Sequence, residues 1–299
     1  MKFPPCNSKT DSHGRELTEH GTTLFPAAYY AVDLERDGVP WHWHDELEVA
    51  VVTRGATIAA ADAERYHLRP GDAIFINADA LHTMWDTTHS GCQMHTVTFH
   101  PRLVGGSIDS IFWQRYVLPL LENPALKAMP LDGSAPWHRQ AVEAIEAAWQ
   151  SCAEQQPGYE FQVRAALSQL IFLLSTHCPS APLHPSEKAL RDDGRIKTML
   201  QYIQTHYAEE LTTQAIAQSA LISDSECLRC FHNTIGTTPI QYLKQFRIQK
   251  AVELLSNTNE KISDIGADCG FQDMSYFTKS FRTAKGCTPS EYRLQKSRE

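Results

Sequence analysis

The sequence has no long hydrophobic run and no start that resembles a secretion signal. Its uninterrupted apolar stretches, such as Leu170–Leu174, are far short of the roughly 20 residues that a transmembrane helix needs. The first 20 residues are polar, with several acidic side chains and no apolar stretch after Lys2. We therefore predict no membrane partner and a cytoplasmic location.

Disulfide and zinc frameworks are also missing. Eight cysteines in a 299-residue chain without an export signal fit reduced thiols better than disulfides. Only Cys227 and Cys230 form a C-x-x-C pair, and no second pair follows at the spacing of a zinc finger. With 42% hydrophobic and 21% charged residues, the composition excludes disordered and fibrous proteins. A chain of this length is expected to fold as two domains.

Charge divides the chain into two unlike parts. Residues 1–189 hold 13 basic and 22 acidic side chains, a net charge of −9, whereas residues 190–299 have a net charge of +1. Three prolines between 178 and 186 interrupt regular structure between these parts. The predicted domain organisation is a polar N-terminal arm at 1–20, an N-terminal domain at 21–177, a linker at 178–192 and a C-terminal domain at 193–299.

The N-terminal domain begins with short segments that are rich in β-branched and aromatic residues. Leu47–Thr53, Ala73–Asn77 and Gln93–Phe99 are examples, separated by Gly, Pro and Asp. This pattern predicts an antiparallel all-β unit. After Ile108 the sequence becomes rich in alanine and leucine and predicts two helices, at about 138–154 and 159–176.

The second of these helices has leucines at the spacing of a coiled-coil seam. The seam residues are Val163, Leu167, Leu170 and Leu174, which follow one another at steps of four and three residues. Two interpretations stay open. The helix either packs on its own domain, or it forms a dimer contact over Glu160–Leu174.

An internal repeat dominates the C-terminal domain. Phe231–Tyr242 and Phe281–Tyr292 share the pattern F-x4-G-x-T-P-x2-Y at an offset of 50 residues. Upstream of each copy, two short helical patterns flank a break, which predicts a helix-turn-helix motif. The predicted helix caps are Thr212 or Thr213, Ser223, Ser263 and Asp273. A connecting helix over Tyr242–Leu255 joins the copies.

This domain resembles the DNA-binding domain of the AraC/XylS family of transcription regulators. The matching residues are Arg247-x3-Ala251-x2-Leu254-Leu255 and Ile262-x2-Ile265-Gly266-x3-Gly270-Phe271-x3-Ser275-Tyr276-Phe277-x3-Phe281-x4-Gly286-x-Thr288-Pro289-x2-Tyr292-Arg293. The resemblance covers residues 195–295. It implies an all-α domain whose two recognition helices enter successive major grooves of double-stranded DNA.

Candidate DNA contacts lie on the outward side of each recognition helix. Cys227 and Phe231 in the first helix, and Phe277 and Phe281 in the second, are expected to be buried. The residues left to face DNA in the first helix are Ser225, Glu226, Arg229 and His232. Those in the second helix are Gln272, Asp273, Met274, Ser275, Thr278 and Lys279.

A second constellation lies in the β-rich part. His42, His44 and Glu48 stand in the pattern G-x3-H-x-H-x3-E-x6-G, and His82 follows Gly71 after ten intervening residues. Side chains of a strand alternate with a period of two, so His42 and His44 share a face. The pattern predicts that these potential metal ligands converge.

The constellation resembles the two motifs of the cupin β-barrel, which hold a divalent metal with three histidines and a glutamate. The resemblance implies an all-β cupin-like barrel with metal ligands His42, His44, Glu48 and His82, suited to Fe, Mn, Ni or Zn. Asn77, Asp79 and Asp86 depart from the second cupin motif.

Two further interpretations of the barrel stay open. Trp41 and Trp43, with His42, His44, Glu48 and His82, are equally suited to line a pocket for an organic effector without metal. In AraC-like regulators the barrel is generally an effector-binding domain, so the resemblance favours this interpretation. The histidines can also be purely structural.

The sequence as a whole predicts a DNA-binding transcriptional regulator, an activator or a repressor, that is controlled by a small molecule in its barrel. The predicted partners are promoter DNA, the effector, RNA polymerase and a second copy of the chain. We do not expect an enzyme, because only His95, His100 and Tyr66 offer further catalytic groups near the site. The alternative is a cupin metal sensor, or an oxygenase-like or isomerase-like metalloenzyme, fused to a DNA-binding domain.

Overall fold

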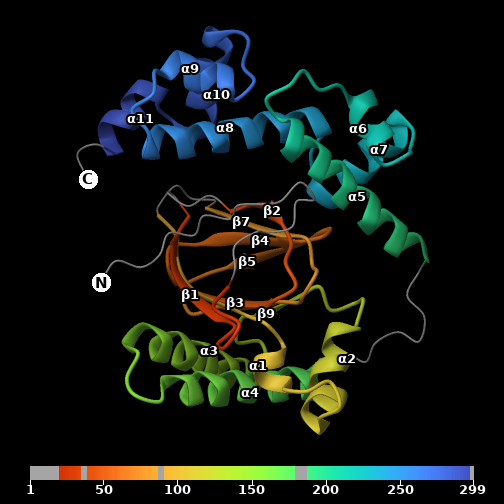
Figure 1. The fold of residues 1–299 in the computed structure, drawn as a ribbon, viewed down its shortest axis with the longest axis vertical. Helices are drawn as coiled ribbons and strands as arrows, with labels where there is room; N and C mark the ends of the chain where they lie inside the picture. The colour runs from red at the N-terminus through yellow and green to blue at the C-terminus, as the bar shows by residue number, and fades with distance from the viewer. Residues whose placement is uncertain (1–19, 35–38, 87–90, 179–186, 297–299) are drawn as a thin grey trace. The chain divides into compact units, whose positions relative to one another are not determined.

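The computed structural model describes residues 20–34, 39–86, 91–178 and 187–296 (Figure 1). The predicted arm at 1–20 therefore lies outside the described residues except for its last position. The chain divides into two compact units with the boundary between Leu190 and Arg191. Helix α5 begins at Glu187, within the 178–192 segment expected to be a linker. Among the described residues, no helix is long and apolar enough to cross a membrane.

The N-terminal unit contains two antiparallel sheets that form a barrel. The five-stranded sheet has the order β1-β8-β3-β6-β9, and the four-stranded sheet has the order β2-β7-β4-β5. The strands are β1 (Ala27–Asp33), β2 (Val39–His42), β3 (Leu47–Arg54), β4 (Thr57–Ala61), β5 (Glu64–Leu68), β6 (Ala73–Ile76), β7 (His82–Asp86), β8 (Gln93–Phe99) and β9 (Ala128–Leu131). The predicted all-β unit is confirmed.

Strand β3 shows how the sequence separates the two faces of the larger sheet. Val49 and Val51 belong to a core that the sheet shares with helices, whereas Ala50 and Val52 belong to the core inside the barrel. All four residues are at most 3% exposed. A strand that is buried on both faces needs apolar residues at successive positions, which explains the continuous apolar run over 49–52.

Two helices, α3 (Pro136–Glu154) and α4 (Tyr159–His177), pack side by side against the five-stranded sheet (Figure 1). They agree with the predicted helices at 138–154 and 159–176. The seam residues of α4 are all fully buried in the core of this unit: Val163, Leu167, Leu170 and Leu174. The interpretation that this seam packs on its own domain is confirmed.

The sequence predicted no helix or strand for the segment between β8 and α3. It contains α1 (Arg102–Gly105), a π-helical turn η1 (Trp113–Val117), α2 (Leu118–Leu121) and strand β9. Strand β9 pairs with β6 and is the last strand of its sheet. Pro130 is tolerated there because an edge strand has one side without ladder hydrogen bonds.

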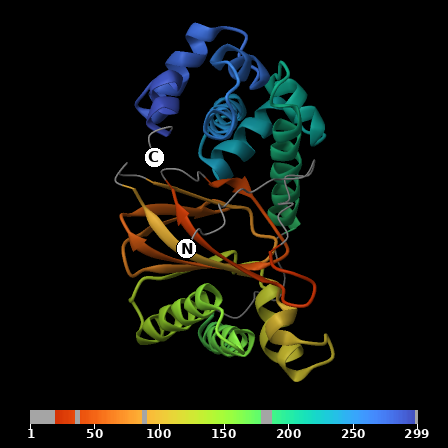
Figure 2. The same ribbon diagram turned by 60° about the vertical axis from the view of Figure 1, so that its left-hand side comes forward.

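The C-terminal unit is entirely helical in its described residues. Its elements are α5 (Glu187–His206), α6 (Thr213–Ser219), α7 (Asp224–Cys230), a π-helical turn η2 (Phe231–Ile235), α8 (Pro239–Asn257), α9 (Ile262–Asp268), α10 (Met274–Lys285) and α11 (Pro289–Lys296). Helices α6–α7 and α9–α10 are two helix-turn-helix motifs near opposite ends of α8, which Figure 2 shows nearly end-on. At 19 residues, α8 spans about 28 Å.

Three of the predicted helix caps are present. Thr212, Ser223 and Asp273 each accept a hydrogen bond from the backbone N–H three residues later, at the starts of α6, α7 and α10. The predicted cap Ser263 is wrong, because α9 begins after Lys261 without a side-chain cap. The Ser263 hydroxyl instead donates to the carboxylate of Asp264.

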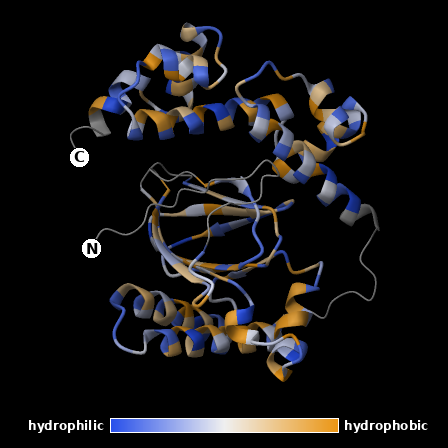
Figure 3. Cartoon of the chain, in the orientation of Figure 1, coloured by the Kyte–Doolittle hydropathy of each residue, from blue (hydrophilic) through white to orange (hydrophobic). Residues whose placement is uncertain are grey.

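The turns of the two motifs differ. Leu221 in the first turn and Gly270 in the second both have left-handed backbones, with φ of +56° and +79°. A Cβ at 270 would lie 2.8 Å from the carbonyl oxygen of Tyr207 and 2.9 Å from that of Ala208, so only glycine fits. Leu221 is 93% exposed, so the first turn has space for a side chain but keeps the backbone strain. Figure 3 shows that hydrophilic and hydrophobic residues alternate along the helices of this unit.

Candidate functional site

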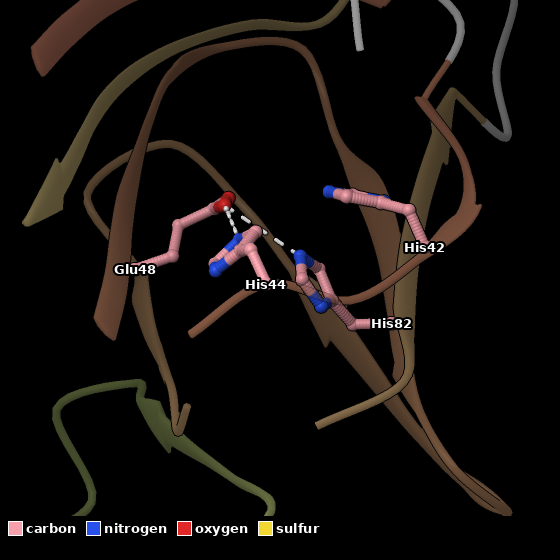
Figure 4. Close-up of side chains that lie close together, drawn as sticks. All are labelled: His42, His44, Glu48 and His82. Carbon is pink, nitrogen blue, oxygen red and sulfur yellow. Dashed lines mark hydrogen bonds and ion pairs between the residues drawn. The ribbon is translucent and has the colours of Figure 1, made fainter. Parts of the chain in front are cut away.

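Four side chains converge inside the barrel (Figure 4). His42 ends β2, His44 follows it, Glu48 lies on β3 and His82 begins β7, where it pairs directly with His42. One ligand atom from each residue lies within 4.8 Å of those of the others. The structure therefore brings together the four residues that the two sequence motifs singled out.

The three imidazole rings are oriented in the same way. Nδ1 of His42 lies 2.9 Å from the carbonyl oxygen of Pro40, and Nδ1 of His44 lies 3.1 Å from that of Glu46. Nδ1 of His82 lies 2.8 Å from the carbonyl oxygen of its second preceding residue. Since a carbonyl oxygen only accepts hydrogen bonds, each Nδ1 carries a proton, and each Nε2 is directed to the common centre.

Glu48 supplies the negative charge of the cluster. Its Oε2 lies 3.1 Å from Nε2 of His44 and 3.5 Å from Nε2 of His82. Burial raises the pKa of this carboxyl, but the hydrogen bonds and positive charge of the two histidines lower it by more than burial raises it. The pKa of Glu48 therefore lies well below its ordinary value. His82 is fully buried.

Two residues next to the cluster were not singled out by the sequence. Nδ1 of His20 lies 3.0 Å from the hydroxyl oxygen of Tyr30, and the His20 ring packs edge-on against the ring of His44 at 5.4 Å. Both residues are only 8% exposed. His20 stands at the end of a polar segment without any motif, so only the three-dimensional structure reveals its place.

Trp41 lies on the other side of its strand from the cluster. Its ring is 5.3 Å from the guanidinium carbon of Arg65. Arg65 pairs with Ala60, whereas His82 pairs with the next residue, Ala61. Neighbouring residues of a strand point to opposite faces, so Arg65 and Trp41 lie on the face opposite His82.

The other tryptophan considered for the pocket, Trp43, stands between two cluster histidines and is buried. A role of Trp41 and Trp43 in effector binding stays a prediction.

The departures from the second cupin motif have structural explanations. Asp79 has a left-handed backbone with φ of +59°, a conformation that glycine prefers and Asp tolerates. Asn77 donates from its side-chain amide to the carbonyl oxygens of Leu120 and Leu126. Asp86 accepts hydrogen bonds from two backbone N–H groups at 91 and 92. These residues shape the barrel without removing a ligand.

The further catalytic candidates are divided between the two sides of the barrel wall. Nδ1 of His95 lies 2.9 Å from the carboxylate of Glu146 on α3, and its ring stacks on Trp149, so His95 faces the helices. Nδ1 of His100 accepts a hydrogen bond from a backbone N–H at 102. Tyr66 packs against the barrel core.

The first recognition helix, α7 with the turn η2, presents three of its four candidates to solvent. Ser225, Arg229 and His232 are exposed. Glu226 is partly buried, and its carboxylate accepts from Arg195 of α5 at 2.8 Å and from Arg229 at 3.2 Å. Glu226 thus joins two helices and orients Arg229.

Cys227 and Cys230 are core residues of the first motif, and the burial of Cys227 was predicted. Both are buried. Burial raises the pKa of Cys227 to about 11 and also raises that of Cys230, so neither thiol is ionised at neutral pH.

The second recognition helix, α10, divides its candidates differently. Gln272, Asp273, Ser275 and Lys279 are exposed, and Lys279 forms no ion pair with any residue in the described ranges. Tyr276, 53% exposed, lies on the same outer side and was missed. Positions 272, 276 and 279 follow the spacing of one helix face, which is the signal that would have found it.

The remaining candidates on α10 have structural contacts. The Asp273 carboxylate accepts from the backbone N–H of Tyr276 at 2.6 Å and caps the helix. The Met274 side chain packs against Gly266, because a Cβ at position 266 would lie 2.8 Å from the Met274 sulfur. The glycine therefore permits the close approach of α9 and α10. The Thr278 hydroxyl donates to the carbonyl oxygen of Met274.

Comparisons with known proteins agree with both units. Residues 25–171 match the model of the AraC-like ligand binding domain, and residues 216–295 match that of a helix-turn-helix domain. The chain is 28% identical over 294 residues to the uncharacterized HTH-type transcriptional regulator YdeC of Bacillus subtilis (strain 168), covering 97% of this chain and 99% of YdeC.

Two further relatives extend over most of the chain. The HTH-type transcriptional activator RhaS of Klebsiella pneumoniae (strain 342) is 24% identical over 280 residues, covering 92% of this chain and 96% of RhaS. A crystal structure of an apo ToxT variant from Vibrio cholerae strain SCE256 shares the fold, with a TM-score of 0.50 and 13% identity over 93% of this chain and 99% of ToxT. The chain therefore belongs to the AraC family of DNA-binding transcriptional regulators that have an N-terminal ligand-binding domain.

Proposed function

We propose that a divalent metal ion, held by His42, His44, Glu48 and His82, forms part of the ligand site of this regulator and controls its binding to DNA. The sequence favoured an organic effector without metal. The orientation of the donor atoms supports the metal. When bound, the ion would supply a positive charge with open coordination positions for a small ligand.

The observation that carries this proposal is the pair of hydrogen-bond acceptors at the two nitrogens of the His44 ring. In His44, Nδ1 faces a carbonyl oxygen and Nε2 faces the carboxylate of Glu48. Without a metal, both contacts need a proton, so a doubly protonated ring would be buried at 2% exposure. With a metal, Nδ1–H donates to the carbonyl oxygen and the lone pair of Nε2 binds the ion.

The same arrangement supports metal at the other ligands. Histidines that bind metals typically donate their second ring N–H to a carbonyl or carboxylate oxygen, which fixes the tautomer, and all three rings have this contact. Ligand atoms about 2.0 to 2.2 Å from one ion lie roughly 3 to 4.4 Å apart. The observed limit of 4.8 Å needs only a small contraction. Fe, Mn, Ni and Zn all accept this donor set.

We propose sensing rather than catalysis for the barrel. His95, one of three additional acid–base candidates, is oriented toward Glu146 on the helical side, and His100 lies at the start of α1. The relatives reported above are named as transcriptional regulators. We place the protein in the cytoplasm, with promoter DNA and RNA polymerase as its partners.

For the DNA interface we propose the exposed candidates on the recognition helices other than Asp273, whose carboxylate caps α10. These are Ser225, Arg229, His232, Gln272, Ser275 and Lys279, with Thr278 beside them. Arg and Lys side chains can bind guanine edges and phosphates, whereas Ser and Gln donate and accept in the major groove. The other three candidates support DNA binding indirectly, because they hold the recognition helices in place: Glu226, Asp273 and Met274.

We propose a second copy of the chain as the partner of the outer face of α4. Phe161 and Phe172 on this face are 81% and 49% exposed. They stand eleven residues apart, which is about three helical turns, so they lie on one side of the helix. Ala165 and Ser168 between them are small enough for a second helix to approach closely.

DNA binding with and without metal tests the proposal. A duplex is first selected from random DNA on the full chain in the presence of Zn²⁺, and its affinity is measured by fluorescence anisotropy before and after chelation. We expect the affinity to change at least tenfold for the wild type and for His95→Ala, and not for His82→Ala. Equal affinities of the wild type with and without Zn²⁺ would contradict metal control.

A further inference from the structure

A buried hydroxyl inside the barrel has no partner. Thr96 on β8 is 4% exposed, and its Oγ1 makes no hydrogen bond. Its neighbours across the sheet are Tyr30 on β1 and Ala50 on β3, which both belong to the core inside the barrel. Thr96 therefore faces the interior, where an unsatisfied polar group is costly.

Thr96 lies close to the proposed metal cluster along strand β8. Thr98 pairs directly with Glu48, and Thr96 is two residues away on the same face of β8. Two residues of a strand span about 7 Å. The hydroxyl of Thr96 is therefore within reach of a small molecule that also touches an ion at the cluster.

The barrel walls carry short side chains at this level. Ala50 lies beside Thr96 on β3, and on the other sheet Ala61 pairs with His82 and Ala59 pairs with Met84. All three alanines are at most 1% exposed. A ligand that extends from the cluster toward Thr96 would meet methyl groups along its body; the interior of a barrel of this size is either filled by side chains or holds one small ligand.

Charge selects the chemical class of that ligand. A divalent ion with one carboxylate and three neutral imidazoles has a net charge of +1. The nine described strands contain only two Lys or Arg side chains: Arg54 is exposed at the end of β3, and Arg65 lies on the face opposite His82. The ion is therefore the one cation that the described strands offer to a ligand inside the barrel, and its complement is a monoanion.

We propose, resting on the metal site proposed above, that the effector is a small monocarboxylic acid with a second oxygen. Its carboxylate binds the ion, and its hydroxyl or keto oxygen accepts a hydrogen bond from the Thr96 hydroxyl. The spacing along β8 of about 7 Å corresponds to a chain of roughly three to six carbons. Plain alkanoic acids bind the ion but leave the Thr96 hydroxyl unsatisfied.

The test uses the full chain loaded with Co²⁺, whose visible absorption reports direct coordination. The probes are hydroxy acids of three to six carbons, the matching alkanoic acids, and 4-hydroxybutanamide, which lacks the carboxylate. We expect at least one hydroxy acid to change the Co²⁺ spectrum and to bind at least tenfold more tightly than its alkanoic counterpart. The amide should leave the spectrum unchanged.

Thr96→Val keeps the shape of the side chain and removes the hydroxyl. We expect it to abolish the tenfold preference for the hydroxy acid, to leave the Co²⁺ content unchanged and to raise the melting temperature of the metal-free protein. Thr83→Val is the matched control, because the Thr83 hydroxyl already donates to the carbonyl oxygen of Val39. It should keep the preference.

The outcomes separate the two proposals. If Co²⁺ does not bind, or binds equally well to His82→Ala, the metal site itself is wrong. If Co²⁺ binds at His82 but no acid changes the spectrum, or the preference survives in Thr96→Val, the effector class is wrong and the metal site stands.

Discussion

The two units of this regulator differ in the solvent exposure of their polar functional groups. In the helical unit, most candidate DNA contacts are exposed, and Arg229 is held by an ion pair with Glu226 of the same unit. In the barrel, His44, Glu48 and His82 are withdrawn from solvent and directed at one another. Exposed and locally satisfied groups suit a large polyanion that arrives from outside, whereas buried groups that converge suit a small ion.

The largest effect should come from removing one barrel ligand. A ligand that binds only the folded state stabilises it by about 2.7 to 4.1 kcal/mol at 100 to 1,000 times its Kd. We expect Zn²⁺ to stabilise the barrel by this amount in the wild type and to have no effect in His82→Ala, measured by chemical denaturation. His95→Ala is the control, because His95 lies outside the cluster. If Zn²⁺ stabilised His82→Ala as much as the wild type, the barrel cluster would not be the metal site.

Gly270→Ala should damage the helical unit alone. The backbone at this position is left-handed, and an added Cβ would lie within 3 Å of two carbonyl oxygens. We therefore expect the free energy of unfolding to fall by about 3 kcal/mol. Denaturation followed by circular dichroism measures this loss, while Zn²⁺ binding should be unchanged. A loss of metal affinity would show that the units are not independent.

Lys279→Ala should weaken DNA binding by about 1 to 3 kcal/mol, which is roughly 5-fold to 150-fold, if the side chain binds a base. The affinity for the selected duplex is measured at several salt concentrations. Arg229→Ala should cost less, because Arg229 is already paired with Glu226. A larger loss of DNA affinity for Arg229→Ala than for Lys279→Ala would contradict this expected order of the two residues.

Acid should affect the barrel through Glu48. The pKa of Glu48 in the folded, metal-free protein lies well below its ordinary value, so the carboxylate stabilises the fold above the unfolded pKa of about 4.3. This contribution is lost as the pH falls through the lowered pKa of the folded state. Denaturation midpoints of wild-type protein should fall more steeply below about pH 4.3 than those of Glu48→Gln. Parallel curves would contradict the charge assigned to the cluster.

The smallest effect is expected at the first turn. Leu221 is almost fully exposed and has φ of +56°, so Leu221→Gly relieves strain without removing a packed side chain. We expect stabilisation of about 0.5 to 1 kcal/mol after the entropy cost of glycine. Destabilisation would mean that the leucine has a contact that this unit alone does not provide.

Much of this arrangement follows from local sequence signals. The spacing of His42, His44, Glu48 and His82 predicted their convergence, because strand periodicity and two motifs suffice to orient them. The double helix-turn-helix motif followed from the repeat and from caps such as Ser223 and Asp273. These features depend on residues that are close in sequence or are repeated.

Other features depend on pairing between distant segments and could not be predicted. Strand β9 is short and contains Pro130, so only its pairing with β6 identifies it. The sequence offered Met274 as a candidate DNA contact, and only the approach of α9 to α10 shows that its sulfur packs against Gly266. The unsatisfied hydroxyl of Thr96 becomes visible only when the strand register places it inside the barrel.

The metal content of the purified chain tests the central claim most directly. The protein is prepared without a metal-affinity tag, and Fe, Mn, Ni and Zn are measured by elemental mass spectrometry for the wild type, His44→Ala and His95→Ala. The donor geometry predicts about one metal ion per chain in the wild type and in His95→Ala, and almost none in His44→Ala. A wild-type protein that stays free of metal after incubation with each of the four ions would contradict the claim.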